Sequence, residues 1–225
     1  METEVSMAAA GGTRELSGTL SRPADAAGLV VFAHGSGSSR LSPRNRMVAG
    51  QLAERGFSTL LFDLLTEDEA QERTNVFDIS LLAGRVVDAI DWIRAQDVVR
   101  ALPIGLFGAS TGAAAALVAA ARAPEHVAAV VCRGGRPDLA DRALPDVRAP
   151  TLLIVGGADH GVIELNEQAY ARLTCTAELR IVPGATHLFE EPGALDAVVD
   201  LVANWFGSYL QAGVNSPGST SNSSR

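Results

Sequence analysis

The sequence predicts an α/β fold, with a mainly parallel sheet and helices on both of its faces. Three observations support this prediction. Short apolar runs alternate along the chain with stretches of helical periodicity. Residues 29–33 are apolar at every position, as is typical of a strand covered on both faces. A strand–turn–helix pattern surrounds residues 108–112. Repeated β-α units form parallel sheets, whose functional residues gather at the carboxyl ends of the strands.

The individual elements follow from apolar runs, helix caps and glycine or proline breaks. Ser42 and Pro43 are suited to the N-cap and first position of a helix that Gly56 ends. Apolar residues at helical spacing predict a second helix over residues 77–95. Weak alternation and short apolar runs predict further strands at 15–20, 58–63, 102–107, 127–132, 151–155 and 178–182. The same reasoning predicts helices at 113–122, 163–173 and 193–210.

The 225 residues suit one large domain, which we expect at residues 13–211. Residues 1–12 are small and irregular in pattern, and residues 212–225 are rich in serine, asparagine, glycine and proline. Segments of this composition bury too little apolar surface to offset their conformational entropy. Both ends are therefore expected to be disordered.

Composition excludes several classes of partner. The formal net charge is −8, with 18 arginines and lysines against 26 acidic residues, which argues against nucleic acid. No apolar stretch approaches the roughly 18–20 residues that span a bilayer, and the N-terminus lacks the pattern of a secretory signal. The two cysteines, Cys132 and Cys175, give neither a disulfide framework nor metal-ligand spacing. We expect a cytoplasmic protein with no nucleic-acid partner, membrane partner or metal.

The pentad GASTG at residues 108–112 is the main functional motif. A chain of this length with 22 glycines contains about 0.15 such pentads by chance. The residues on either side of the pentad therefore determine whether it indicates a functional turn. An apolar run at 102–107 precedes it, and an alanine-rich stretch at 113–122 follows until Pro124. Strand, sharp turn and helix with a serine at the apex form a nucleophile elbow. Ser110 is therefore the candidate nucleophile.

A serine hydroxyl needs a base to accept its proton near neutral pH. His187 follows the last predicted strand and lies on a loop at the carboxyl edge of the sheet, so it is the candidate base. The other three histidines are less well placed. His34 precedes a glycine-rich turn and suits a structural role, His126 lies at the opposite end of the sheet, and His160 adjoins a loop aspartate.

The base needs a carboxylate to hold its tautomer and stabilise the imidazolium. Asp159 follows the strand at 151–155 and lies at the same carboxyl edge. Glu164, Glu190 and Glu191 are competing carboxylates, either on the next helix or just beyond the histidine. Asp159 is favoured by its placement, and the resulting order serine, aspartate, histidine is that of an α/β-hydrolase.

Acyl transfer also needs N–H donors for the developing oxyanion. The Thr111 N–H opens the helix after the nucleophile, where the helix dipole assists. The loop HGSGSS at residues 34–39 follows the strand at 29–33, and its Ser36 N–H is the expected second donor. The alternative for this loop is a flexible glycine-serine turn.

Two arginines are candidates for binding an anionic substrate group. Arg40 follows the oxyanion loop, and Arg133 lies at the carboxyl end of the strand at 127–132. The alternative is that both are solvated loop or helix residues.

The motifs VVFAHGSGSS, GASTG, GGADHG and PGATHLFEEPGAL together resemble those of α/β-hydrolases of the dienelactone-hydrolase-like group, over residues 18–210. The resemblance implies an eight-stranded sheet, an esterase-type triad and no cofactor. Dienelactone hydrolase itself carries a cysteine nucleophile, whereas this chain has Ser110. General hydrolase chemistry is therefore expected, and a lactone substrate is not specified.

These observations predict a serine hydrolase that cleaves a small carboxylic ester or lactone through an acyl-enzyme. No insertion is long enough for a large cap domain, and the longest connection near the site is the polar segment 64–75. An open site is expected. Two alternatives use the same fold: acyl transfer or perhydrolysis by the same triad, and a binding protein without catalysis.

Overall fold

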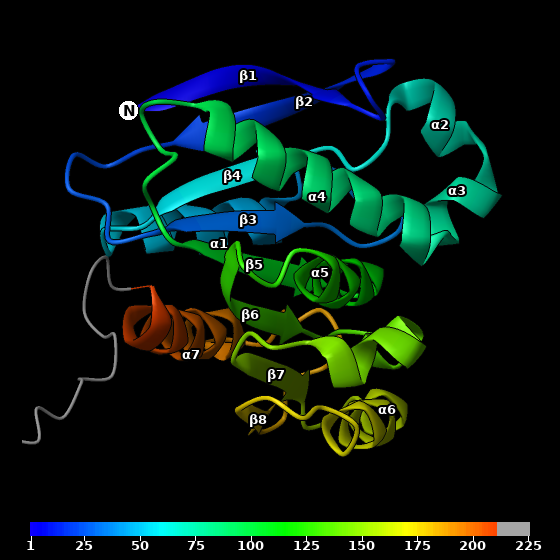
Figure 1. Ribbon diagram of the computed structural model, residues 1–225. Helices are drawn as coiled ribbons and strands as arrows, with labels where there is room; N and C mark the ends of the chain where they lie inside the picture. Colours follow the sequence, from blue (N-terminus) through cyan, green and yellow to red (C-terminus); the bar gives the residue numbers. More distant parts are fainter. Residues whose placement is uncertain (211–225) are drawn as a thin grey trace, which may run out of the picture.

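Eight strands form one sheet in the computed structural model, which describes residues 1–210. They are β1 (Glu2–Ala9), β2 (Arg14–Ser21), β3 (Leu29–Ala33), β4 (Ser58–Phe62), β5 (Ile104–Ala109), β6 (Val127–Arg133), β7 (Thr151–Gly156) and β8 (Ala177–Val182). Their order is β1-β2-β4-β3-β5-β6-β7-β8, seen from top to bottom in Figure 1. The pairs β1–β2 and β2–β4 at one edge are antiparallel, and all pairs from β4–β3 to β7–β8 are parallel.

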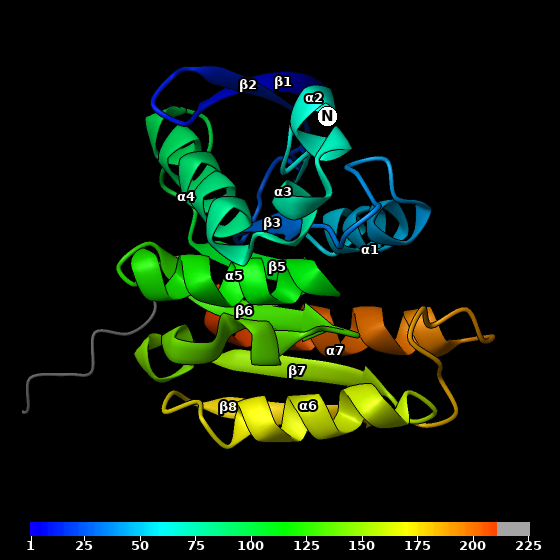
Figure 2. The ribbon, with the colours of Figure 1, turned by 90° about the vertical axis from the view of Figure 1, so that its right-hand side faces the viewer.

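Helices cover both faces of this sheet. They are α1 (Pro43–Glu54), α2 (Glu67–Gln71), α3 (Arg73–Phe77), α4 (Ile79–Ala95), α5 (Thr111–Arg122), α6 (His160–Tyr170) and α7 (Ala194–Tyr209), with a 3-10 segment η1 (Pro137–Asp146). Figure 2 shows α5 and α6 in front of the sheet and α7 behind it. Side chains of α1 and α7 share one buried cluster, and those of α4 and α5 share another. The predicted α/β class, with a mainly parallel sheet, is confirmed.

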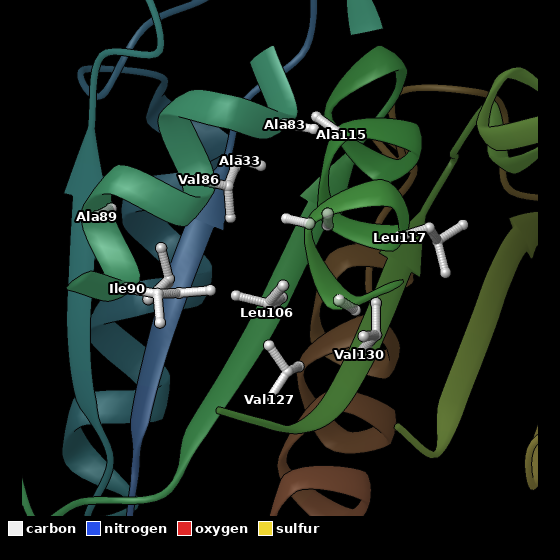
Figure 3. Close-up of a cluster of buried hydrophobic side chains, with 14 of the residues drawn as sticks. Ala33, Ala83, Val86, Ala89, Ile90, Leu106, Ala115, Leu117, Val127 and Val130 are labelled. Atoms are coloured by element: carbon white, nitrogen blue, oxygen red, sulfur yellow. The ribbon is translucent and has the colours of Figure 1, made fainter. Parts of the chain in front are cut away.

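Buried apolar residues form the two layers that hold the helices on the sheet. Figure 3 shows part of the larger layer, where Val86 and Ile90 of α4 lie with Leu106 of β5 and Val130 of β6. Alanines 113–116 at the start of α5 are fully buried. Their small side chains let this helix lie close to both α4 and the sheet.

The expected disorder of residues 1–12 is wrong. Residues 2–9 form strand β1, which pairs with β2 over eight residue pairs from Glu2–Ser21 to Ala9–Arg14. Met7 and Ala9 face the core and are buried, while Ser6 and Ala8 are exposed. This alternation stabilises an edge strand although most of its residues are small or polar. The predicted disorder of residues 212–225 concerns a segment outside the described residues.

The polar segment 64–75 is mostly helical and forms α2 and the start of α3. Thr66 and Glu69 make a reciprocal capping box at the start of α2. The Glu69 carboxylate also accepts a hydrogen bond from Arg85 of α4 at 2.7 Å and lies 3.4 Å from Arg14 of β2. Neither α2 nor α3 has a buried residue. Polar contacts with distant elements therefore hold α2, while Leu64, at the start of the segment, is fully buried in the core.

No helix within residues 1–210 has the length and apolar character needed to cross a membrane.

A close contact between α5 and β3 places the functional edge of the sheet. A Cβ built at Gly112, in the first turn of α5, would overlap the carbonyl oxygens of Ala33 and His34. Only glycine lets the start of α5 approach the end of β3 this closely. The contact brings the loop after β3 beside the turn between β5 and α5.

Gly112→Ala should lower the free energy of unfolding by at least about 2 kcal/mol, because the new methyl group meets backbone that cannot rotate away. Gly50→Ala is the matched control, since Gly50 lies in α1 with nothing within 4 Å of the added Cβ. That change should raise stability by up to about 1 kcal/mol through helix propensity. Urea unfolding of both variants measures the difference, and equal midpoints would contradict the contact.

Candidate active site

Ser110 lies at a strained turn between β5 and α5. Its φ of 52° and ψ of −124° belong to a region that non-glycine residues rarely adopt. A Cβ built at Gly108 would lie 2.5 Å from the carbonyl oxygen of Gly112, so both glycines of the pentad are needed to close the turn. The geometry is that of the predicted elbow.

His187 and Asp159 form a direct contact at the same edge of the sheet. The His187 Nδ1 lies 2.7 Å from the Asp159 Oδ2. The side chains are 38% and 17% exposed, respectively. A carboxylate on Nδ1 fixes the proton there and leaves Nε2 as the basic nitrogen. Asp159 and His187 were predicted as partners, and the structure brings them together.

Backbone contacts between the loops after β7 and β8 produce this pairing. The Gly157 N–H donates to the Val182 carbonyl at 2.8 Å, and the Ala158 N–H donates to the Ala185 carbonyl at 2.9 Å. A Cβ at Gly156 would overlap the Ala185 carbonyl oxygen. The loop that carries Asp159 is thus fixed against the loop that carries His187.

Two of the three competing carboxylates, Glu190 and Glu191, have other partners. Glu190 accepts a hydrogen bond from Arg44 at 3.1 Å. Hydrogen bonds from Thr186 hold the pKa of the Glu191 carboxyl below its usual value. Asp159 is the carboxylate that contacts the histidine.

The loop after β6 connects Ser110 with His187. The Ser110 N–H donates to the Arg133 carbonyl at 3.4 Å, and the Arg136 N–H donates to the Ser110 carbonyl at 3.0 Å. A Cβ at Gly134 would lie 2.9 Å from the His187 carbonyl oxygen. Within residues 1–210, the Ser110 hydroxyl makes no hydrogen bond, so the serine–histidine contact itself is not formed. Catalytic hydrogen bonds often tighten only when substrate binds.

The loop after β3 lies directly against the nucleophile. A Cβ at Gly35 would lie 2.8 Å from the Ser110 Cβ. The next residue, Ser36, donates its backbone N–H to the Thr111 Oγ1 at 2.8 Å. Sequence reasoning placed this N–H at the oxyanion but did not identify its bond to the threonine side chain.

His34 holds this loop to the segment after β4. Its Nδ1 pairs with the Gly35 carbonyl at 3.0 Å, and its Nε2 lies 3.1 Å from the Leu64 nitrogen. Nδ1 therefore carries the proton and Nε2 accepts from the Leu64 N–H. Burial lowers the pKa of His34, partly offset by the Gly35 carbonyl and by Asp63. A neutral, structural histidine agrees with the role expected from the sequence.

A cavity of about 640 Å³ adjoins the oxyanion loop. Residues 34–41 form one wall, and the segment after β4 forms another through Leu64 and Thr66. Ala70 of α2 and Val76 of α3 also line it. Its volume falls within the range of small-molecule sites.

The two candidate arginines differ in their surroundings. Arg40 lines the cavity, but its guanidinium forms an ion pair with Asp63 at 2.6 Å. Arg133 is buried, donates to Asn45 at 3.2 Å and lies over the Phe189 ring. Burial lowers the pKa of Arg133 to about 10, with Arg44 contributing. Binding of an anionic substrate group stays a prediction that these contacts do not support.

The lowered pKa of His34 predicts a pH dependence of stability. In the unfolded chain His34 has its ordinary pKa of about 6.5, so as the pH falls the unfolded chain takes up a proton at His34 before the folded protein does. The contribution of His34 to the free energy of unfolding is therefore fully present above about pH 6.5 and is lost as the pH drops toward the pKa of His34 in the folded protein. The free energy of unfolding should therefore fall between pH 7.5 and 5.5 by more in the natural protein than in His34→Asn. His126→Asn, at an exposed histidine, should keep the natural slope. Chemical unfolding at several pH values measures this, and equal slopes for all three proteins would refute it.

Comparison with known proteins agrees with this fold. The model of the dienelactone hydrolase family matches residues 16–208. A dienelactone hydrolase from Anabaena variabilis is 55% identical, with a TM-score of 0.90 over 94% of this chain and 99% of its own. Est1E from Butyrivibrio proteoclasticus is 17% identical, with a TM-score of 0.76 over 91% of this chain and 98% of its own, and shows the same fold.

Two proteins of Mycobacterium tuberculosis, from strains CDC 1551 and H37Rv, are 57% identical over 195 residues and carry the name "Putative phosphoribosyl transferase". The match covers 87% of this chain and 44% of theirs, so the chain spans less than half the length of these relatives. The match to the family model and the fold of the Anabaena enzyme cover nearly all of the described residues. The chain belongs to the dienelactone hydrolase family of α/β-hydrolases.

Proposed function

We propose that this hydrolase cleaves a small carboxylic ester or lactone through an acyl-enzyme on Ser110. The observation that carries the proposal is the 2.7 Å contact between His187 and Asp159 at the sheet edge that also presents the strained Ser110 turn. The nucleophile, the orienting carboxylate and the base thus follow β5, β7 and β8 of the same sheet, with β6 between the first two.

The chemistry follows from these roles. Ser110 Oγ attacks the carbonyl carbon while His187 Nε2 accepts the hydroxyl proton. The carbon–oxygen bond to the leaving group breaks, and His187 returns the proton to that oxygen. Water then attacks the acyl-enzyme by the reverse route, and Ser110 recovers its proton. Asp159 keeps the imidazole in the tautomer that each step requires.

The cavity beside the oxyanion loop has room for a small substrate, although Ser110, Asp159 and His187 are not among the residues that line it. It lies on the side of the oxyanion loop that faces α2 and α3, and apolar Leu64, Val76 and Leu82 line part of it. A lactone fits the name of the Anabaena relative, and a short linear ester fits the same volume.

We infer that the transferase name of the Mycobacterium relatives refers to the rest of their length. The match to these relatives covers 87% of this chain and the hydrolase family model matches residues 16–208, so the two matches overlap over most of the chain. Hydrolysis is therefore the activity assigned to this chain.

Ser110→Ala should abolish hydrolysis of p-nitrophenyl esters and lactones, leaving less than about a thousandth of the natural kcat/KM. A fluorophosphonate probe should label the natural protein at Ser110 and leave the variant unlabelled. The natural protein could be labelled by the probe and fail to hydrolyse esters, yet form an acylated product when an alcohol or peroxide acceptor is added. That result would show that the activity is acyl transfer or perhydrolysis and not hydrolysis. A folded protein that is neither labelled nor active would be a binding protein.

Asp159→Asn should lower kcat by about 10⁴, because the amide favours the wrong tautomer of His187 while the fold is kept. Glu190→Gln is the matched control, since Glu190 lies three residues after His187 but pairs with Arg44. The control should retain kcat within about threefold, as expected for an exposed ion pair. Steady-state kinetics on one ester compare the two, and similar losses would remove Asp159 from its proposed role.

A further inference from the structure

The Thr111 side chain lies at the junction of nucleophile and oxyanion loop. Thr111 directly follows Ser110 and is the first residue of α5. Its side chain is almost completely buried, with the residue 5% exposed. Its Oγ1 accepts the Ser36 N–H at 2.8 Å, although Ser36 is 75 residues away in the sequence. The Thr111 hydroxyl therefore makes a hydrogen bond between the two residues, Ser36 and Thr111, whose N–H groups were expected to bind the oxyanion.

The proton of this hydroxyl has no acceptor among residues 1–210. The hydrogen bond to Ser36 uses Oγ1 as the acceptor and leaves its O–H free to donate. The Thr111 backbone N–H is also without an acceptor in the described part of the chain, as expected at the first position of a helix. A nearly buried donor without a partner is unfavourable by about 1–3 kcal/mol. Two unpaired donors on one residue beside Ser110 are available to an acceptor that arrives with the substrate.

We propose that the Thr111 hydroxyl is a catalytic donor to the oxyanion. The Ser36 N–H donates to Thr111 Oγ1, and the Thr111 O–H donates to the substrate oxygen as it becomes negative. Each hydrogen bond polarises the next, so Ser36 acts through the threonine. No proton leaves Thr111, and the bond weakens again when the carbonyl re-forms. This inference rests on the proposed acyl-enzyme mechanism and specifies which groups hold its charged intermediate.

Two substitutions separate this role from its alternatives. Thr111→Val keeps the shape but removes donor and acceptor, and should lower kcat by about 10²–10³ with KM within about threefold. Thr111→Ser keeps the hydroxyl and should restore kcat to within about fivefold of the natural value. A boronic acid that forms a tetrahedral anion on Ser110 should lose affinity for Thr111→Val by a comparable factor, measured by calorimetry without turnover.

Three results would overturn the proposal. A kcat for Thr111→Val equal to or above the natural value would mean that Thr111 only competes for the Ser36 N–H. A raised KM and lowered thermal midpoint with kcat retained would mean that it only holds the loop. A Thr111→Ser variant as slow as Thr111→Val would exclude the hydroxyl.

A different result would contradict the proposed function itself: a Ser110→Ala variant that still hydrolyses esters. Natural protein that neither hydrolyses esters nor binds the boronic acid would overturn both proposals.

Discussion

The approach of α5 to the end of β3 is the contact on which the site depends. Gly112 allows the helix to begin against the Ala33 and His34 carbonyls, where a side chain would overlap them. Because of this approach, Ser110 is beside Gly35, and Thr111 reaches Ser36. The same backbone path forces Ser110 to a φ of 52°. Strain at the nucleophile is therefore a consequence of packing, and the buried alanines of α5 help to maintain it.

The remaining groups are positioned by a different means. The loops after β7 and β8 exchange backbone hydrogen bonds, and Gly156 lets them lie in contact. Asp159 and His187 therefore keep their distance without help from a long-range side-chain network. The loop after β6 links this pair to the elbow through the Arg133 carbonyl and Gly134. The site is built from backbone contacts at the ends of four neighbouring strands, β5 to β8, which carry its reacting side chains.

Features that depend on local pattern could be predicted from the sequence, and those that depend on distant contacts could not. The elbow follows from the spacing of two glycines around Ser110, and the pairing of Asp159 with His187 follows from strand order. β1 was missed because its alternation involves small and polar residues whose partner strand stabilises them. The α2 helix was missed although the Thr66–Glu69 capping box is a local signal, because its five residues bury no side chain and Arg85 and Arg14 hold Glu69 from other elements. The bond from Ser36 to Thr111 depends on a rotamer and on a loop path, neither of which has a sequence pattern.

The absence of buried residues in α2 and α3 has a consequence for access to the cavity. Elements that bury little apolar surface open with a free energy well below that of global unfolding. The wall formed by Ala70 and Val76 is therefore the part of the cavity with the lowest local stability. Charge around Glu69 ties this wall to the sheet, and the Arg14 side chain there is 47% exposed and open to screening by dissolved ions. Ionic strength should therefore weaken the Arg14 contact, whereas the Arg85–Glu69 pair, whose side chains are 5% and 12% exposed, is screened much less.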